Sequence, residues 1–335
     1  MKKLNQIPIK TTNNFGVNTV DIDFLIPSTF DFDDYKTHNL NIKSSIKNKL
    51  FSKIGLEVPK YLDSTIELDK YVEYKEPIIL IKDLNDNLAD KITIKALKNS
   101  KANIILLYRG KNVFHYLVID GEIEENACVN LSIVNLLDND SKIFTSVSNI
   151  IKENAELHTN IIDLEGHIKV SNYYSNIIGQ NGKDYLKSIY FGQNNDIIDI
   201  NYDIKNKGRN TISDIETVGC LTDNASKTMK MSIDFVTGAA KSVGKEIEKC
   251  ILLSDNVTSK SVPLLLCTEE DVQGVHSVAT GKVDYEKVFY IMSRGFSYKD
   301  AIKIIINGDL NNIISNINDN KIKDEVLKKI NDFLE

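Results

Sequence analysis

Residues 76–110 read EPIILIKDLNDNLADKITIKALKNSKANIILLYRG. Three short apolar segments, EPIILIKDL, KITIKAL and ANIILLYRG, alternate here with Asn, Asp, Lys and Ser. Each segment is rich in β-branched or aromatic residues, and residues that favour turns bound it. This pattern predicts three consecutive β-strands joined by short turns, with no helix between them.

The same pattern of short apolar segments separated by turn residues continues to about residue 284. Segments such as VFHYLVIDGEIEE, CVNLSIVNLLD, HTNIIDLEG and TMKMSIDFVTG repeat it without the period of an amphipathic helix. Such a chain argues against a doubly wound α/β fold and leaves three all-β forms: a sandwich, a barrel and a parallel β-helix. A sandwich needs many tight hairpin turns, but only Asp120-Gly121 and Asn181-Gly182 are of that type. A β-helix is therefore at least as good an interpretation.

The two ends of the chain differ from this β body. Towards the C-terminus, YEKVFYIMSRGF places Val288, Ile291 and Met292 on one helical face. A second helix is predicted after an N-cap at Ser297, and DEVLKKINDFLE predicts a short final helix. The N-terminal part is mixed, with a Lys-rich stretch that predicts a helix over 40–54. The expected organisation is an N-terminal α/β segment (1–75), a β core (76–284) and a C-terminal helical domain (285–335).

Composition narrows the class of partner. The chain has 335 residues, a formal net charge of −6 and no Lys/Arg block isolated from acidic residues, so nucleic acid is not expected as its main partner. The N-terminus MKKLNQIPIKTTNN has no apolar run behind its lysines, and no apolar stretch approaches the ~20 residues of a membrane span. We expect a cytoplasmic protein without a secretory signal or a membrane segment.

The four cysteines are widely spaced and form no CxxC pair, so reduced and mostly buried thiols are expected. Cys250 and Cys267 are separated by 17 positions, close to one turn of a solenoid with repeats of ~20 residues, which makes them candidate vertical neighbours. Whether any cysteine is a metal ligand stays open for all four: Cys128, Cys220, Cys250 and Cys267.

Two further motifs bear on ligands. The stretch GAAKSVGKE resembles a phosphate-binding loop, but its glycine spacing is too long and Glu246 stands where a Ser or Thr should bind magnesium. No nucleotide is expected on this chain. Among the five histidines, His276 differs because Gly274 and Gly281 bracket it and acidic residues precede it. Histidine is a common metal ligand, so His276 is a candidate, although packed or surface histidines are more frequent.

Several segments, in order, carry a family resemblance. FGQNNDIIDINYDIKNKGRNT, SDIETVGCLTDNASKTM, IDFVTGAAKSVGKE, LLSDNVTSKSVPLLLCTEEDVQGVHSVATGKVD and VFYIMSRGFSYKDA resemble the core and C-terminal region of the SufB/SufD family, from about residue 181 to 307. The resemblance implies a right-handed parallel β-helix and a scaffold on which iron–sulfur clusters form. It also implies a complex with SufC, an ABC-type ATPase that binds the C-terminal helices.

Particular positions indicate the branch of that family. Val257 stands where SufB proteins have a sulfur-accepting cysteine, and Ser277 where they have a glutamate after the loop histidine. His276 is kept, as in SufD, where the histidine is implicated in cluster assembly at the subunit interface. Gly274 stands where some SufD proteins have a cysteine. The resemblance therefore implies a SufD-like subunit, with His276 as the residue that helps to hold iron or a nascent cluster.

The function predicted on this basis is a non-catalytic scaffold with a transient iron–sulfur cluster. Its partners are a SufC-type ATPase and either a SufB-like subunit or a second copy of this chain. A rival is a purely architectural β-helix subunit that contributes no cluster ligand. A β-helix carbohydrate enzyme is more remote, because the acidic residues offer no favoured carboxylate pair. Val257 and His276 are 19 positions apart, which predicts that they stack on adjacent coils.

Overall fold

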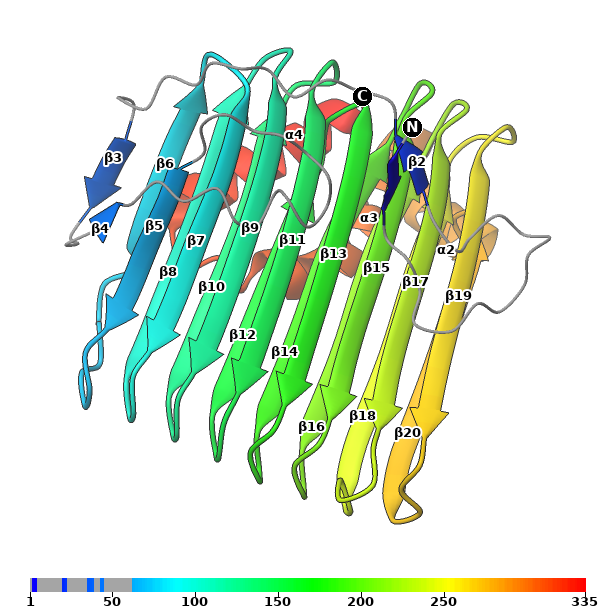
Figure 1. The fold of residues 1–335 in the computed structure, drawn as a ribbon. Coiled ribbons are helices and arrows are strands. Elements are labelled where there is room, and N and C mark those ends of the chain that lie inside the picture. Colours follow the sequence, from blue (N-terminus) through cyan, green and yellow to red (C-terminus); the bar gives the residue numbers. More distant parts are fainter. Residues whose placement is uncertain (1, 5–19, 23–34, 39–42, 45–61) are drawn as a thin grey trace.

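The computed structural model describes residues 2–4, 20–22, 35–38, 43–44 and 62–335. Two long sheets face each other and run the length of the molecule (Figure 1). We call the first the helix-side sheet, because the helices α3 (Tyr298–Ile314) and α4 (Asn320–Phe333) lie on it, and the second the opposite sheet. A further small antiparallel pair joins β1 (Lys2–Leu4) and β2 (Val20–Ile22).

Strands alternate between the two sheets along the chain. The helix-side sheet contains β3 (Tyr35–His38), β6 (Ile78–Leu84), β8 (Lys101–Gly110), β10 (Cys128–Leu137), β12 (Glu156–Asp163), β14 (Lys183–Gly192), β16 (Ile212–Leu221), β18 (Ser242–Leu252) and β20 (Val272–Gly281). The opposite sheet contains β4 (Lys43–Ser44), β5 (Leu62–Leu68), β7 (Leu88–Ala96), β9 (Phe114–Ile123), β11 (Lys142–Ile151), β13 (Ile168–Ile177), β15 (Ile197–Asn206), β17 (Ser226–Phe235) and β19 (Thr258–Cys267).

Every pairing among β5 to β20 is parallel, and only β3 and β4 join these two sheets antiparallel. Successive strands therefore wind as coils of a solenoid, and the predicted parallel β-helix is confirmed, whereas a hairpin-built sandwich or a closed barrel is excluded. Parallel pairing already includes β5, before residue 76. Of the predicted helix over 40–54, residues 43–44 form β4 instead, and the rest lies outside the described residues.

One coil is longer than the ~20 residues assumed from sequence. Cys128 pairs with Lys101 and Glu156, 27 and 28 positions away, because most strands span about ten residues and each coil uses two of them. The predicted vertical neighbours are therefore wrong. Cys250 pairs with Thr280, Cys267 with Phe235, and His276 with Glu246, while Val257 precedes β19.

Asparagines explain why the turns are not hairpins. Asn126, Asn154, Asn181 and Asn210 occupy equivalent turns with φ of 57, 52, 58 and 58°, a left-handed conformation that asparagine tolerates better than most residues. The side chains of the last three form a ladder between coils, since the Asn181 amide donates to Asn154 at 2.8 Å and the Asn210 amide to Asn181 at 2.6 Å. These turns bend the chain from one sheet to the other.

The space between the sheets holds a mainly aliphatic core with several buried polar groups. The Tyr190 ring lies across Gly219, where an added Cβ would come within 1.9 Å of the ring. The Tyr190 hydroxyl consequently reaches past β16 and donates to Glu248 on β18 at 2.9 Å. Glu248 also accepts from Lys227 across the interior.

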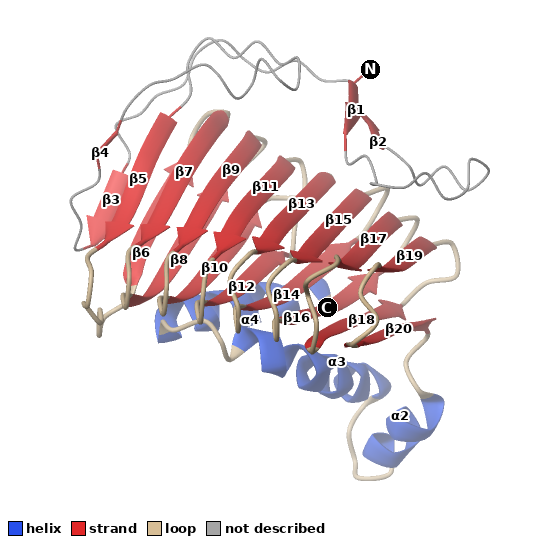
Figure 2. Ribbon diagram, turned by 60° about the horizontal axis from the view of Figure 1, so that its bottom comes forward, coloured by secondary structure: helices blue, strands red, loops and turns tan. Residues whose placement is uncertain are grey.

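Three helices follow β20: α2 (Tyr285–Met292), α3 (Tyr298–Ile314) and α4 (Asn320–Phe333). The predicted N-cap at Ser297 is confirmed, because its hydroxyl accepts from the amide of Asp300 at 3.1 Å. Helices α3 and α4 lie along the outer face of the helix-side sheet (Figure 2). A second apolar cluster joins them to that face, with helix-region residues Ile306, Leu310, Ile313, Ile314, Ile317, Ile322, Val326, Ile330 and Leu334.

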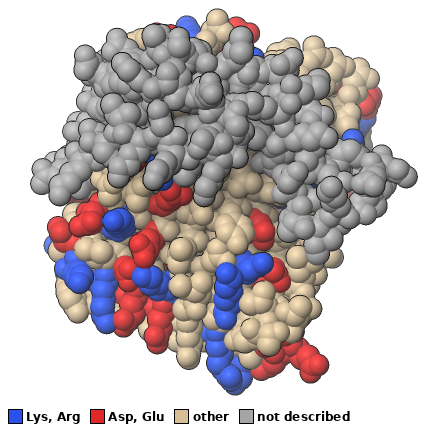
Figure 3. All heavy atoms as spheres, viewed as in Figure 1, with Lys and Arg blue, Asp and Glu red and all other residues tan. Residues whose placement is uncertain are grey.

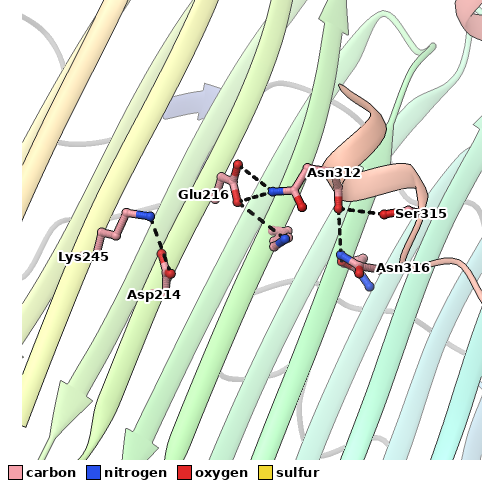
Figure 4. A network of polar contacts seen from close by, with 8 residues as sticks. Asp214, Glu216, Lys245, Asn312, Ser315 and Asn316 are labelled. Carbon is pink, nitrogen blue, oxygen red and sulfur yellow. Dashed lines mark hydrogen bonds and ion pairs between the residues drawn. The ribbon is translucent and has the colours of Figure 1, made fainter. Parts of the chain in front are cut away.

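Polar contacts fix these helices to the sheet. The Asn312 amide donates to both oxygens of Glu216 on β16, at 3.1 and 3.0 Å (Figure 4). We call α3 and α4 together the strap. At the α4 end of this strap, the Arg109 guanidinium donates to both oxygens of Glu325 at 2.7 and 2.6 Å. Bidentate pairs of this kind fix orientation as well as distance, so the strap is held at several coils.

Candidate functional site

The solenoid ends at an uncovered coil made of β19 and β20. In the described residues, β20 hydrogen-bonds to β18 and β19 to β17, and each is the last strand of its sheet. Nearly all of β20 is exposed, although its alternating partners on β18 are buried. An edge of this kind offers unpaired backbone donors and acceptors to another chain. The last coil is therefore the natural place to look for an intermolecular site.

His276 lies in the middle of β20 and is exposed. It pairs in register with Glu246 on β18. Neighbouring parallel strands in register present paired side chains on the same face, about 4.8 Å apart along the sheet. Glu246 faces the interior, as Cys250 does four residues later in the core cluster. His276 therefore stands on the inward-facing row of the uncovered coil.

Glu246 is fully buried. Burial raises the pKa of Glu246 to about 8, against a smaller lowering by the backbone of Ile233. Sequence reasoning treated Glu246 only as the residue that spoils a phosphate-loop motif and missed its position beneath His276.

A charged pair lines the interior beside this position. The Lys227 ammonium donates to Glu248, to the Ser261 hydroxyl at 2.8 Å and to the Lys260 carbonyl at 3.4 Å. An ammonium has three protons to donate, so Lys227 is fully used by these partners. It links the inward-facing row of β18 to the last coil on β19 without reaching Glu246.

Gly274, two residues before His276, allows close packing between β20 and β19. A Cβ at Gly274 would lie 2.5 Å from Leu265 of β19, so the Leu265 side chain fills the space that the missing side chain leaves. Gly244, its partner on β18, leaves room in the same way for Phe235, 2.6 Å from a Cβ there. The two glycines therefore permit an apolar wall on one side of the His276 and Glu246 pair.

The structure does not gather the four cysteines at one site, although Cys220 and Cys250 lie on adjacent strands, on opposite faces of the helix-side sheet. Cys220 is buried under the helices, and burial raises the pKa of its thiol well above the ordinary value. Cys250 is buried in the core, and Cys128 lies half-buried with a pKa also raised by burial. Cys267 is exposed and its thiol donates to the Glu269 carbonyl at 2.8 Å. All four are free thiols.

No group of three or more His, Cys, Asp or Glu side chains that could hold a metal occurs within the part of the chain that the structure describes. His276 and Glu246 together supply one nitrogen and one carboxylate, which is fewer than the four or more ligands of a closed transition-metal site. Any iron or cluster at this coil would therefore need further ligands from outside the described residues.

A second surface lies on α2. Asp284 caps this helix by accepting from the amide of Glu286 at 3.0 Å, and Val288 is its one buried residue. The predicted shared face of Val288, Ile291 and Met292 is therefore only partly correct, because Met292 is 40% exposed. Large apolar side chains project into solvent here, including Tyr285, Phe289, Tyr290, Phe296 and Tyr298. Exposed groups of this kind mark protein contacts.

The opposite sheet carries charges of both signs on its visible described surface (Figure 3). Lys91 pairs with Asp120 at 2.7 Å and Lys205 with Asp234 at 3.0 Å. Paired charges of this kind do not form the concentrated basic surface that phosphate binding needs. None of the described helices is both long and apolar enough to cross a membrane.

Comparisons with known proteins agree with this architecture. Residues 79–309 match the family model for the SufBD core domain of the SUF system of FeS cluster assembly. A SufBD family iron–sulfur cluster assembly protein of Pyrococcus horikoshii is 26% identical over 247 residues, which are 71% of this chain and 54% of that protein. A SufBD family protein of Methanocaldococcus jannaschii is 22% identical over 265 residues, or 76% of this chain and 82% of that protein.

The iron–sulfur cluster assembly protein SufD of Bacillus subtilis is 24% identical over 161 residues, which are 48% of this chain and 37% of that protein. The chain thus spans about half of the Pyrococcus protein and about a third of the Bacillus one. The family model nevertheless covers most of the present chain. The chain belongs to the SufB/SufD family of iron–sulfur cluster assembly proteins and is SufD-like within it.

Proposed function

We propose that this chain is a non-enzymatic scaffold subunit of a Suf-type complex, and that a nascent iron–sulfur cluster forms at its uncovered last coil. The observation that carries the proposal is the exposed His276 on the inward-facing row of the last coil, whose strands pair with no further strand among the described residues. A second β-helix subunit, either SufB-like or another copy, would cover this coil. The cluster is cargo here, assembled and then released.

The partial ligand set supports an interface rather than a site within one chain. Imidazole nitrogen is a suitable ligand for iron. Since the described residues hold no three-ligand group, the second subunit would supply the remaining ligands. The four free thiols agree with a reducing compartment, and we place the complex in the cytoplasm.

We further propose that the C-terminal helices dock a SufC-type ATPase mainly through α2. Helices α3 and α4 are committed to the sheet by their apolar faces and by the Arg109–Glu325 and Asn312–Glu216 contacts. Helix α2 has most of its aromatic side chains in solvent. ATP hydrolysis in the partner would then act on α2 and, through the short segment after β20, on the last coil.

The first prediction concerns His276. A complex of the full chain with its β-helix partner and the ATPase is purified anaerobically, and its mass, iron and sulfide are measured together. His276→Ala is expected to leave the mass of the complex unchanged and to lower iron and sulfide severalfold, because a ligand is lost without disturbing the buried coil below. His158→Ala, which changes a histidine on β12, is the matched control.

Two outcomes would contradict this assignment. Normal iron and sulfide in the intact His276→Ala complex would remove the imidazole from cluster formation. A smaller yield of complex with normal iron per intact complex would instead favour the rival, an architectural subunit in which His276 only contacts its partner. Since the mass, the iron and the sulfide are measured on one preparation, a loss of complex assembly can be distinguished from a loss of cluster formation.

A further inference from the structure

Lys227 on β17 connects the last coil to the body of the solenoid. Its side chain is fully buried, and its ammonium donates to Glu248 on β18. The same ammonium donates to the Ser261 hydroxyl at 2.8 Å and to the Lys260 carbonyl at 3.4 Å, both on β19. One side chain therefore joins the two sheets and reaches β19, the last described strand of the opposite sheet. We call these contacts the Lys227 tie.

The anionic partner in this tie is itself held in place. The Tyr190 hydroxyl on β14 donates at 2.9 Å to the same Glu248 oxygen that Lys227 contacts. The Lys227 ammonium also lies 5.8 Å from the centre of the Tyr190 ring. Hydrogen bonds to charged groups are stronger than neutral ones, and a water-excluded interior strengthens them further. The inner coils thus fix the position of Lys227, which in turn fixes part of β19.

The last coil depends on such a contact more than the inner coils do. Within the described residues, β19 and β20 each hydrogen-bond to one strand of their sheet only. All of their side chains are half-buried or exposed. Regions with few buried apolar contacts open more easily than the rest of a fold. The Lys227 tie supplies a buried polar contact to β19 where apolar burial is scarce.

The position of β19 affects the surroundings of His276. Leu265 of β19 lies 2.5 Å from a Cβ added at Gly274 of β20, so these two positions face each other across the last coil. The short turn after β19 makes the two strands run in opposite directions, and residues two apart on a strand share a face. Counting from this contact places Pro263 across from His276, with Ser261 next on the same row as Pro263.

We propose that Lys227 is a positioning residue for the assembly site: it holds β19 across from β20 and so fixes the wall that faces His276. This inference rests on the proposed function, in which the nascent cluster forms at this coil. Lys227 touches no ligand and acts on His276 only through the shape of the coil. Glu248 and Tyr190 act with it by fixing its ammonium.

Two variants weaken the Lys227 tie in different ways. Ser261→Ala removes the hydroxyl acceptor on β19 and leaves the buried ion pair in place. The double variant Lys227→Met, Glu248→Met replaces the whole ion pair with apolar side chains of similar length. Folded interiors commonly tolerate the replacement of both partners of a buried pair, whereas the loss of one partner leaves an uncompensated charge.

An ion pair in the first coils provides the matched control. Lys82 on β6 binds the buried Asp90 on β7, which also accepts from the Tyr108 hydroxyl at 3.1 Å. The three groups are chemically equivalent to those around Lys227, but they lie at the opposite end of the solenoid. The double variant Lys82→Met, Asp90→Leu should therefore have a similar effect on overall stability without reaching the last coil.

Hydrogen exchange of the full chain measures the tie directly, because the β19 amides that donate to β17 exchange only when the last coil opens. We expect these amides to exchange at least about tenfold faster in both tie variants and at the wild-type rate in the control. Iron and sulfide are then measured in the anaerobic complex with the β-helix partner and the ATPase. Both tie variants should lower them severalfold per intact complex, and the control should not.

The outcomes separate this inference from the function on which it rests. Wild-type exchange at β19 in both tie variants, or equally fast exchange in the control, overturns the positioning role. Fast exchange with normal iron and sulfide per intact complex overturns it as well, because Lys227 is then a purely structural contact. None of these results contradicts the proposed function, which the His276→Ala complex tests by its own iron and sulfide. If the Lys227 double variant does not fold, Ser261→Ala decides by the same two measurements.

Discussion

At the scale of single residues, His115 shows how burial sets a charge state. Its side chain is fully buried, and its ring centroid lies 4.0 Å from that of Tyr108. Burial, helped by the positive charge of Lys82, lowers the pKa of His115 to about 3. The folded chain therefore keeps this ring neutral where an unfolded chain would protonate it.

This difference predicts an acid-dependent loss of stability. Between pH 6.5 and pH 3 the unfolded chain binds a proton at residue 115 that the folded chain does not, so His115 lowers stability as the pH falls through that range. His115→Leu should remove about 2–4 kcal/mol of the stability lost between pH 7 and pH 4. Urea unfolding of wild type and of His115→Leu at pH 7 and pH 4 measures this change in the free energy of unfolding.

The test compares the acid-dependent loss of stability in wild type with that in His115→Leu. This comparison is needed because other buried groups change the stability with pH in the opposite sense. Burial raises the pKa values of Asp163 and Asp184 to about 6, so their folded forms retain protons and their contribution declines as the pH rises from about 4 to 6. Both carboxyl groups are present in wild type and in His115→Leu, so their contributions cancel when the two proteins are compared. An equal acid loss in wild type and His115→Leu would contradict the burial argument.

Of the two residues described at the last coil, only one could be identified from the sequence. His276 could be predicted from its bracketing glycines and from the family resemblance. Glu246 could not, because it lies 30 positions earlier in a motif that resembled something else, and the assumed repeat of ~20 residues did not bring it near. Aligning KEIEKC with VHSVAT at a spacing of 30 would have paired the two residues. The register between strands, rather than local composition, carries that information.

At the scale of elements, strands could be predicted and turns could not. β-branched runs marked the strands because they suit a pleated surface. Asn154 and Asn181 gave no specific signal, since asparagine suits hairpins, loops and solenoid bends alike. The run NIILLY in β8 also lacks alternation for a physical reason: Ile104 and Leu106 face the core, while Ile105 and Leu107 are covered by the helices.

Helix α2 leads to a prediction about partner binding. Phe289 and Tyr290 are 62% and 59% exposed, so replacing them disturbs little inside this chain. The double variant Phe289→Ser, Tyr290→Ser should weaken binding to the SufC-type ATPase at least about tenfold, since exposed aromatics commonly dominate interfaces. Affinity is measured by calorimetry with the purified ATPase, and the circular dichroism of the chain should not change.

Lys287→Ala, on the same helix and also exposed, is the matched control for the α2 variant. Unchanged ATPase affinity in the double variant would place the docking surface elsewhere on the chain. Removing residues 297–335 is a poorer test, because it uncovers the apolar outer face of the helix-side sheet, including Val134, Ile162 and Phe191. Aggregation of that deletion would then hide any specific loss of binding.

At the scale of the whole molecule, the helical strap changes how the solenoid holds together. Coils of a solenoid contact mainly their neighbours, but α3 and α4 contact strands from β8 to β18, through Arg109–Glu325 at one end and Lys249–Asp309 at the other. The fold class and the C-terminal helices could be predicted from sequence. The strap could not, because the apolar faces of helices and sheet match equally well in many arrangements.

The strap should therefore be removable without unwinding the β-helix. Val326 is fully buried where α4 meets the helix-side sheet, and a carboxylate there has no water to solvate it, at a cost of several kcal/mol. Val326→Asp should release α4, expose the apolar outer face and increase binding of a hydrophobic dye, while the β signal in circular dichroism persists. Lys328→Asp adds the same carboxylate on the exposed face of α4 and should do neither. Loss of the β signal together with α4 in Val326→Asp would show instead that the coils depend on the strap for their own folding, and that strap and solenoid unfold as one cooperative unit.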